Sequence, residues 1–190
     1  MGKSVVPCRY QFLVMKRTLM IILVFFIYGE GQTQSPCGGD PVYRQFDFWI
    51  GNWEAFGPKG QKAGDSKISL ILDSCIILEE WTSATIQKNL RYQGKSFNTY
   101  NAQTKQWQQT WVDNTGSTTH YLLGKAEFNR IIFQTIPPAD PKDTSGINRL
   151  TFFKLDENKV RQLGEISKDA GKTWIVQYDL EYRRKTNGNQ

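Results

Sequence analysis

Histidine and cysteine are scarce in this sequence, which limits the chemistry that it can perform. The 190 residues contain one histidine, His120, and three cysteines. A zinc site needs several Cys, His or carboxylate ligands close together, and a catalytic triad needs a histidine beside its nucleophile. The chain has no Gly-x-Ser-x-Gly, His-x-x-x-His or Cys-x-x-Cys motif and no phosphate-binding glycine loop. We therefore expect no metal site and no cofactor, and we interpret His120 as an ordinary strand residue.

A long apolar run is also missing. The longest run, residues 19–27, is shorter than the roughly 20 residues that a membrane-spanning helix needs. It follows a basic pair at residues 16–17 and precedes small residues, which is the order of a secretory signal peptide. We interpret residues 1–31 as a signal peptide cleaved before Gln32, with cleavage near Gln34 as the alternative. The exported chain is then expected to have no integral membrane segment.

The chain that remains, residues 32–190, has the length of a single domain. Met15 is an alternative translation start, because the basic pair that follows it is an ordinary beginning for a signal peptide. Removal of residues 1–31 takes away four basic residues and one acidic residue, which lowers the net charge from +6 to about +3. The basic cluster at residues 183–185 is interpreted as a solvated tail. We expect no nucleic-acid partner, and the sequence leaves the oligomeric state open.

Only two cysteines, Cys37 and Cys75, follow the predicted cleavage site. Paired cysteines in an exported chain indicate a disulfide, because the compartment is oxidising. This bond would tie the segment before the first strand to the third predicted strand. Two unpaired thiols are the alternative.

The rest of the chain has the rhythm of a β protein. Runs rich in Ile, Thr, Phe, Tyr and Trp alternate with short polar turns. We predict ten strands, at residues 52–57, 65–73, 75–84, 91–100, 105–113, 117–124, 126–136, 147–155, 159–167 and 173–184. Closure would remove the exposed edges of such a sheet, so we favour a single antiparallel up-and-down barrel over an open sandwich.

Two segments do not fit the strand pattern. Residues 42–50 repeat apolar side chains at helical spacing, which predicts a short N-terminal helix that could plug one end of the barrel. Residues 137–146 contain three prolines, which exclude a central strand and predict a surface loop or flap.

The predicted strand 105–113 places Trp107, Gln109, Trp111 and Asp113 on one face, because side chains alternate along a strand. Two indoles beside an amide and a carboxylate are typical of a partly polar pocket wall. Gln109 and Trp111 are therefore candidate ligand-binding residues, and Asp113 is a candidate catalytic residue. The alternative is that both indoles pack in the core and Gln109 bonds to a neighbouring strand.

The predicted strand 75–84 contains two adjacent carboxylates, Glu79 and Glu80, and alternation turns one of them toward the apolar side. If Glu79 lies inside with Trp81, burial would raise its pKa. Glu79 would then be a candidate proton donor or a hydrogen-bonding anchor for a ligand, with Trp81 beside it as a ligand-binding residue. A structural glutamate paired with Arg or Lys is the alternative.

Gln162 is the fourth candidate ligand-binding residue. It lies on the predicted strand 159–167, where a shift of one residue in register would exchange the inner and outer faces. The sequence does not fix this register, and we take Gln162 as the pocket residue of the strand.

Residues 167–174 fit the pattern S-x-D-x-G-x-T-W, which resembles the Asp-box hairpin of sialidases and other secreted β proteins. The physical basis is local: Ser167 and Asp169 would bond turn amides, Gly171 would take a conformation that other residues avoid, and Trp174 would cover the hairpin. We assign these four residues a structural role in a turn and no catalysis.

A signature at residues 46–54, FDFWIGNWE, fits FDFW-x-G-x-W. Together with Cys75, the Glu-Glu-Trp run after it, the two-tryptophan strand and the Asp-box hairpin, it resembles a family of uncharacterised exported bacterial proteins similar to calycin-type, lipocalin-like barrels. The resemblance spans nearly the whole exported chain and implies a barrel that holds a small apolar ligand. Haem-binding barrels of related shape use a histidine near the C-terminal end, which this chain lacks.

Three functions follow from these predictions. The one we favour is an exported binder of a small hydrophobic or amphipathic molecule, lined by Trp81, Gln109, Trp111 and Gln162. The second is an enzyme, which we favour less, with Glu79 or Asp113 as proton-transfer group for isomerisation or cyclisation. The third is a filled barrel with a structural or interaction role. A cavity of about 300 Å³ or more would favour the first two.

Overall fold

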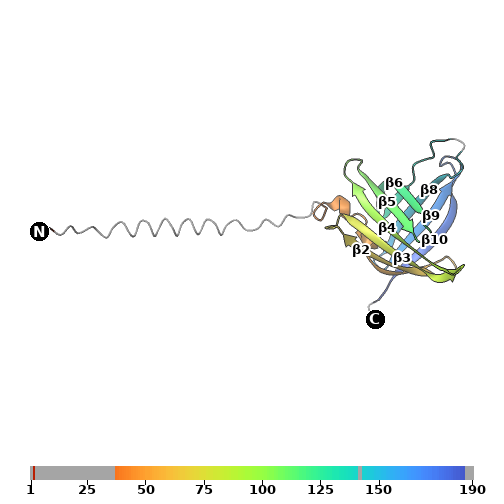
Figure 1. The fold of residues 1–190 in the computed structure, drawn as a ribbon, viewed down its shortest axis with the longest axis horizontal. Coiled ribbons are helices and arrows are strands. Elements are labelled where there is room, and N and C mark those ends of the chain that lie inside the picture. Colours follow the sequence, from red (N-terminus) through yellow and green to blue (C-terminus); the bar gives the residue numbers. More distant parts are fainter. Residues whose placement is uncertain (1, 3–36, 141–142, 187–190) are drawn as a thin grey trace. The chain divides into compact units, whose positions relative to one another are not determined.

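The chain folds into one closed antiparallel β-barrel (Figure 1). The computed structural model describes residue 2, residues 37–140 and residues 143–186. Within these residues ten strands pair in sequence order, and β1 closes the barrel against β10. The strands are β1 Gly51–Phe56, β2 Lys62–Ile71, β3 Ile76–Gln87, β4 Leu90–Asn101, β5 Gln106–Asp113, β6 Thr118–Glu127, β7 Arg130–Gln134, β8 Ile147–Asp156, β9 Lys159–Ser167 and β10 Ile175–Arg184. The predicted all-β, up-and-down barrel is confirmed, whereas the predicted signal peptide lies outside the described residues apart from residue 2.

The largest boundary difference lies between β6 and β7. The sequence predicted a break near residue 125, but β6 continues to Glu127 and the chain turns at Asn129, whose φ is +58°. Gly124, which ends the predicted strand 117–124, lies inside β6. A β-carbon on Gly124 would lie 2.1 Å from the backbone oxygen of Trp107, so the close approach of two strands explains this glycine.

The N-terminal plug, residues 41–50, closes one end of the barrel. The predicted single helix is two 3-10 turns, η1 Pro41–Arg44 and η2 Asp47–Trp49, because Phe46 between them leaves the helical conformation. Phe46 and Trp49 are fully buried, and their stacked rings lie 5.1 Å apart. Phe152 of β8 lies 4.4 Å from the Trp49 ring, so the plug packs directly on the inner face of the sheet.

The predicted disulfide is present between Cys37 and Cys75. Cys75 lies in the turn before β3 rather than on the strand itself. The bond therefore joins the segment just before the plug to the turn that connects β2 and β3. The C-terminal end of β10 lies at the same end of the barrel, because the backbone nitrogen of Lys185 donates to the carbonyl of Asn52 at 2.8 Å.

Replacement of both cysteines, Cys37→Ala with Cys75→Ala, is expected to lower the free energy of unfolding by about 4 kcal/mol. The reason is entropic, because the bond closes a loop with a sequence separation of 38 residues. Urea unfolding followed by tryptophan fluorescence measures the change, and reduction of the wild-type protein should reproduce it. A loss below about 1 kcal/mol would mean that aromatic packing alone holds the plug.

Candidate functional site

The inward side chains form three layers along the barrel axis. The layer next to the plug is apolar and includes Trp53, Ile68, Ile77, Trp107, Phe133 and Phe152. The middle layer is polar and buried, and consists of Ser66, Glu79, Ser96, Asn98, Gln109 and Gln162. The third layer surrounds a cavity of about 580 Å³. Because its residues come from strand ends distant from the plug, the cavity opens at the other end of the barrel.

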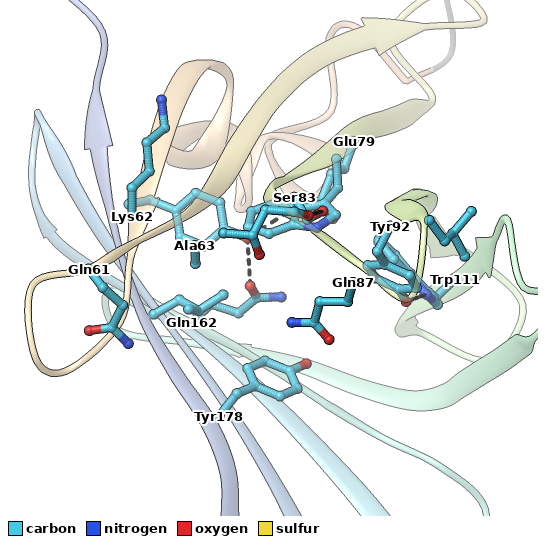
Figure 2. Close-up of a pocket in the computed structure, with 15 residues that line it drawn as sticks. Gln61, Lys62, Ala63, Glu79, Ser83, Gln87, Tyr92, Trp111, Gln162 and Tyr178 are labelled. Carbon is cyan, nitrogen blue, oxygen red and sulfur yellow. Dashed lines mark hydrogen bonds between the residues drawn. The ribbon is translucent and has the colours of Figure 1, made fainter.

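The cavity walls are mainly apolar, with five aromatic side chains, and the polar side chains Ser83, Gln87 and Gln162 lie around the same space (Figure 2). Its lining residues are Gln61, Lys62, Ala63, Glu79, Trp81, Ser83, Thr85, Gln87, Leu90, Tyr92, Trp111, Gln162, Tyr178, Leu180 and Tyr182. They come from β2, β3, β4, β5, β9 and β10 and from the loop before β2.

Glycines on neighbouring strands shape the aromatic walls. Three rings of the wall lie so close to a glycine that an added β-carbon would come within 2.5 Å of a ring atom. The pairs are Trp81 with Gly64, Trp111 with Gly94, and Tyr178 with Gly164. Each ring occupies the space that a larger residue at the glycine position would fill, so it packs against the wall of the cavity.

Glu79 is the central group of the cavity floor. Its side chain is buried, and its two carboxylate oxygens accept hydrogen bonds from Ser66 at 2.9 Å and from Ser96 at 3.0 Å. The hydroxyl of Tyr182 makes a longer contact of 3.5 Å. Among the described residues, the hydrogen-bond partners of Glu79 are hydroxyls rather than Arg or Lys, so the predicted alternative of a salt-bridged glutamate is wrong.

Asn98 orients the hydrogen bonds beneath Glu79. The Asn98 amide nitrogen donates to the backbone carbonyl of Ile77 at 3.0 Å and to Ser96 Oγ at 2.9 Å. Its oxygen accepts a 2.7 Å bond from the amide nitrogen of Gln109. Since Ser96 Oγ already accepts a hydrogen, its own hydrogen goes to Glu79.

Gln162 provides the second polar group of the floor. Its side-chain oxygen accepts a 2.6 Å hydrogen bond from the Tyr182 hydroxyl. The amide nitrogen of Gln162 points toward the space between Gln87 and Tyr178 (Figure 2). The floor therefore offers an N–H donor from Gln162 beside the carboxyl group of Glu79.

Burial raises the pKa of Glu79 to about 7, although the hydrogen bonds from Ser66, Ser96 and Tyr182 act in the opposite direction.

The pKa of Asp113 shifts in the other direction. Burial acts to raise its pKa, but hydrogen bonds from Thr115, Tyr92 and Trp111 together lower it to about 2. Asp113 is therefore ionised at neutral pH, and Glu79 is the better candidate for proton transfer.

The structure brings most of the sequence-predicted residues together. Glu79, Trp81, Trp111 and Gln162 all line the cavity. Gln109 faces inward as predicted but lies beneath the cavity, where it bonds to Asn98 as in the predicted alternative. Sequence reasoning missed Tyr92, Tyr178, Leu180 and Tyr182. The last three alternate along β10, and this period of two is the signal that could have identified them.

The Asp-box hairpin connects β9 and β10 and has the predicted local bonds. Ser167 accepts from the amide of Gly171 at 2.7 Å, and Asp169 accepts from the amide of Thr173 at 2.8 Å. Gly171 has a φ of +89°, and the indole of Trp174 donates to the Gly171 carbonyl at 3.1 Å. None of these residues lines the cavity, in agreement with a structural role.

The described part of the chain contains no group of three or more His, Cys, Asp or Glu side chains arranged to hold a metal ion. It also contains no helix that is long and apolar enough to cross a membrane. His120 is exposed on β6 and lies 3.2 Å from the hydroxyl of Thr110.

The raised pKa of Glu79 predicts a characteristic dependence of stability on pH. The folded state holds the proton more tightly than the unfolded chain, whose glutamate pKa is about 4.5. The stabilisation of the folded state by the Glu79 proton is complete below pH 4.5. This stabilisation is lost as the pH rises through about 7. Between pH 5 and pH 8 the free energy of unfolding should therefore fall by about 2–3 kcal/mol more in the wild type than in Glu79→Gln.

Urea unfolding at several pH values measures this difference. Glu80→Gln is the matched control, because Glu80 lies on the outer face of the same strand and pairs with Lys95 at 2.9 Å. The control should keep the wild-type dependence. Parallel curves for the wild type and Glu79→Gln would contradict the assigned pKa.

Comparison with known proteins does not assign the chain to a family. No protein-family model matches the sequence. No curated protein is significantly similar to it.

Proposed function

We propose that the protein is exported and binds a small hydrophobic or amphipathic molecule inside its barrel. The observation that carries this proposal is the cavity of about 580 Å³, closed at one end by the plug and open at the other. Ligand pockets typically have volumes of about 300–1,000 Å³, with mostly apolar walls and a few polar groups that orient the ligand. The aromatic walls and the floor of Glu79 and Gln162 match this description.

The cavity volume disfavours a filled barrel with a purely structural role. Residues larger than glycine at positions 64, 94 and 164 would displace the three rings that lie against them. Glycine in a strand interior weakens the strand, because it adds backbone entropy and has no side chain to pack. A barrel that needed only a packed core would gain stability from larger residues at these positions.

Export is part of the proposal and rests on two features. Residues 1–31 have the order of a signal peptide. The Cys37–Cys75 disulfide is typical of proteins that fold in an oxidising compartment. An exported protein with an apolar cavity that opens at one end suits the transport or storage of a molecule that is poorly soluble in water.

One observation favours an enzyme as the second candidate. A general acid or base works best when its pKa lies near the working pH, and burial raises the pKa of Glu79 to about 7. Glu79 also lies beside the Tyr182 hydroxyl at the cavity floor. This arrangement would suit proton transfer in an isomerisation or a cyclisation.

Native mass spectrometry of the exported protein, purified without detergent, tests the proposal directly. We expect a small molecule at one copy per chain, which denaturing analysis would then identify. Trp111→Ala should reduce its occupancy, because Trp111 forms part of the cavity wall.

A pair of blocking variants tests the location of the site. Ser83 lines the cavity on β3, whereas its neighbour Ala84 points to the other face of the strand. Ser83→Trp should reduce the affinity for the neutral fluorescent probe N-phenylnaphthylamine by about tenfold or more, and Ala84→Trp should leave it unchanged. Equal effects of the two variants in a fluorescence titration would place the probe outside the cavity.

A further inference from the structure

Glu79 is the acidic group of the cavity, and no basic side chain neutralises it. Of the described residues that line the cavity, only Lys62 and Glu79 are ionised at neutral pH in their usual states. Lys62 lies at the rim, where its ammonium group is 2.7 Å from Glu54 and 3.0 Å from Asp65. Among the described residues, the carboxyl group of Glu79 therefore has no cationic partner.

The hydrogen bonds around Glu79 suit its ionised form. Ser66 of β2 and Ser96 of β4 each donate to one of its oxygens, and the Asn98 amide fixes the direction of the Ser96 bond. A proton on the Glu79 oxygen that faces Ser96 would compete with the Ser96 hydrogen. Hydrogen bonds of this direction stabilise a carboxylate, whereas burial destabilises it. A cation supplied by a ligand would offset part of the remaining cost of burying the charge.

The walls above Glu79 also suit a cation. The Tyr92 hydroxyl and the Trp111 indole nitrogen both bond to Asp113, at 3.0 Å and 3.2 Å. Their polar edges are thus turned to Asp113, a second ionised carboxylate. Aromatic faces attract cations through the negative potential above the ring, and tryptophan does so most strongly.

We propose that the cavity binds an organic cation, namely an apolar or aromatic amine held as its ammonium ion, with the charge at Glu79 and the apolar body between Trp81, Trp111 and Tyr178. This inference rests on the proposed binding function and narrows its ligand class. An apolar carboxylate such as a fatty acid is disfavoured, because its charge would meet Glu79. The amide nitrogen of Gln162 can in addition donate to a neutral acceptor on the ligand.

Three probes of equal size and different charge test the inference by isothermal titration calorimetry. They are naphthylmethylamine, naphthylmethanol and naphthoate, each titrated at pH 8 into the full exported protein. We expect the amine to bind about tenfold or more tightly than the alcohol, and the carboxylate to bind most weakly.

Variants at two adjacent positions assign the effect to one carboxylate. Glu79→Gln should remove the advantage of the amine over the alcohol and leave the binding of the alcohol within about threefold of the wild type. Glu80→Gln should preserve the wild-type ranking, because Glu80 lies outside the barrel beside Lys95.

The pH dependence of the wild type tests the same point without a substitution. The amine stays protonated between pH 5 and pH 8, whereas Glu79 must release its proton to pair with it. The affinity of the amine should therefore be constant above about pH 7 and fall by about tenfold per pH unit below it. In the lower range, Glu79 should release a proton to the buffer when the amine binds.

The other groups around Glu79 do not titrate in this range. Tyr92, Tyr178 and Tyr182 have pKa values raised by burial, and the pKa of Asp113 is about 2. Ser66 and Ser96 carry no charge.

The outcomes separate the two proposals. If none of the probes binds, the proposed binding function fails and the inference fails with it. If the alcohol binds as tightly as the amine, or the affinity of the amine is independent of pH, the cavity is a binding site but its ligand is not a cation.

Discussion

A closed barrel of ten strands encloses more space than its inward side chains readily fill, because barrel diameter grows with strand number. The protein meets this constraint differently at its two ends. At one end Phe46 and Trp49 of the plug fill the interior. At the other end, rings pack closely against glycines and a cavity remains open. The position of the plug therefore determines where a cavity can exist, and the polar layer around Glu79 marks the boundary between the two halves.

Much of this arrangement follows from local sequence features. Strand rhythm predicts the barrel, and strict alternation along β3 and β5 correctly turns Glu79, Trp81 and Trp111 inward. Alternation gives the face of a residue but not its depth along the barrel axis, so Gln109 was expected in the cavity although it lies one layer below. Tyr178 illustrates a different limit. The period of two from Tyr178 to Tyr182 shows that these side chains share a face, but it does not show which face. The register shift between Val176 and Tyr178 decides this, and no local pattern reveals such a bulge.

The polar layer shows how one group can serve either of two functions. Buried polar networks are favourable only when every member is hydrogen-bonded, and the bonds of Ser66, Ser96, Asn98 and Gln109 meet this condition around Glu79. The same burial that prepares a carboxyl group for proton transfer also prepares it to hold a cation. The difference between a carrier and an enzyme then depends on whether the bound molecule places a reactive bond next to Glu79.

Both ends of the described barrel lie beside the plug. Cys37 is fastened to the turn before β3, and Lys185 is bonded to the start of β1. A linker or solid support attached through either end would leave the mouth of the barrel facing the bulk solution. The protein can thus be immobilised in one orientation without obstructing entry to its interior. The position of both ends away from the mouth also suits it to fusion with other domains.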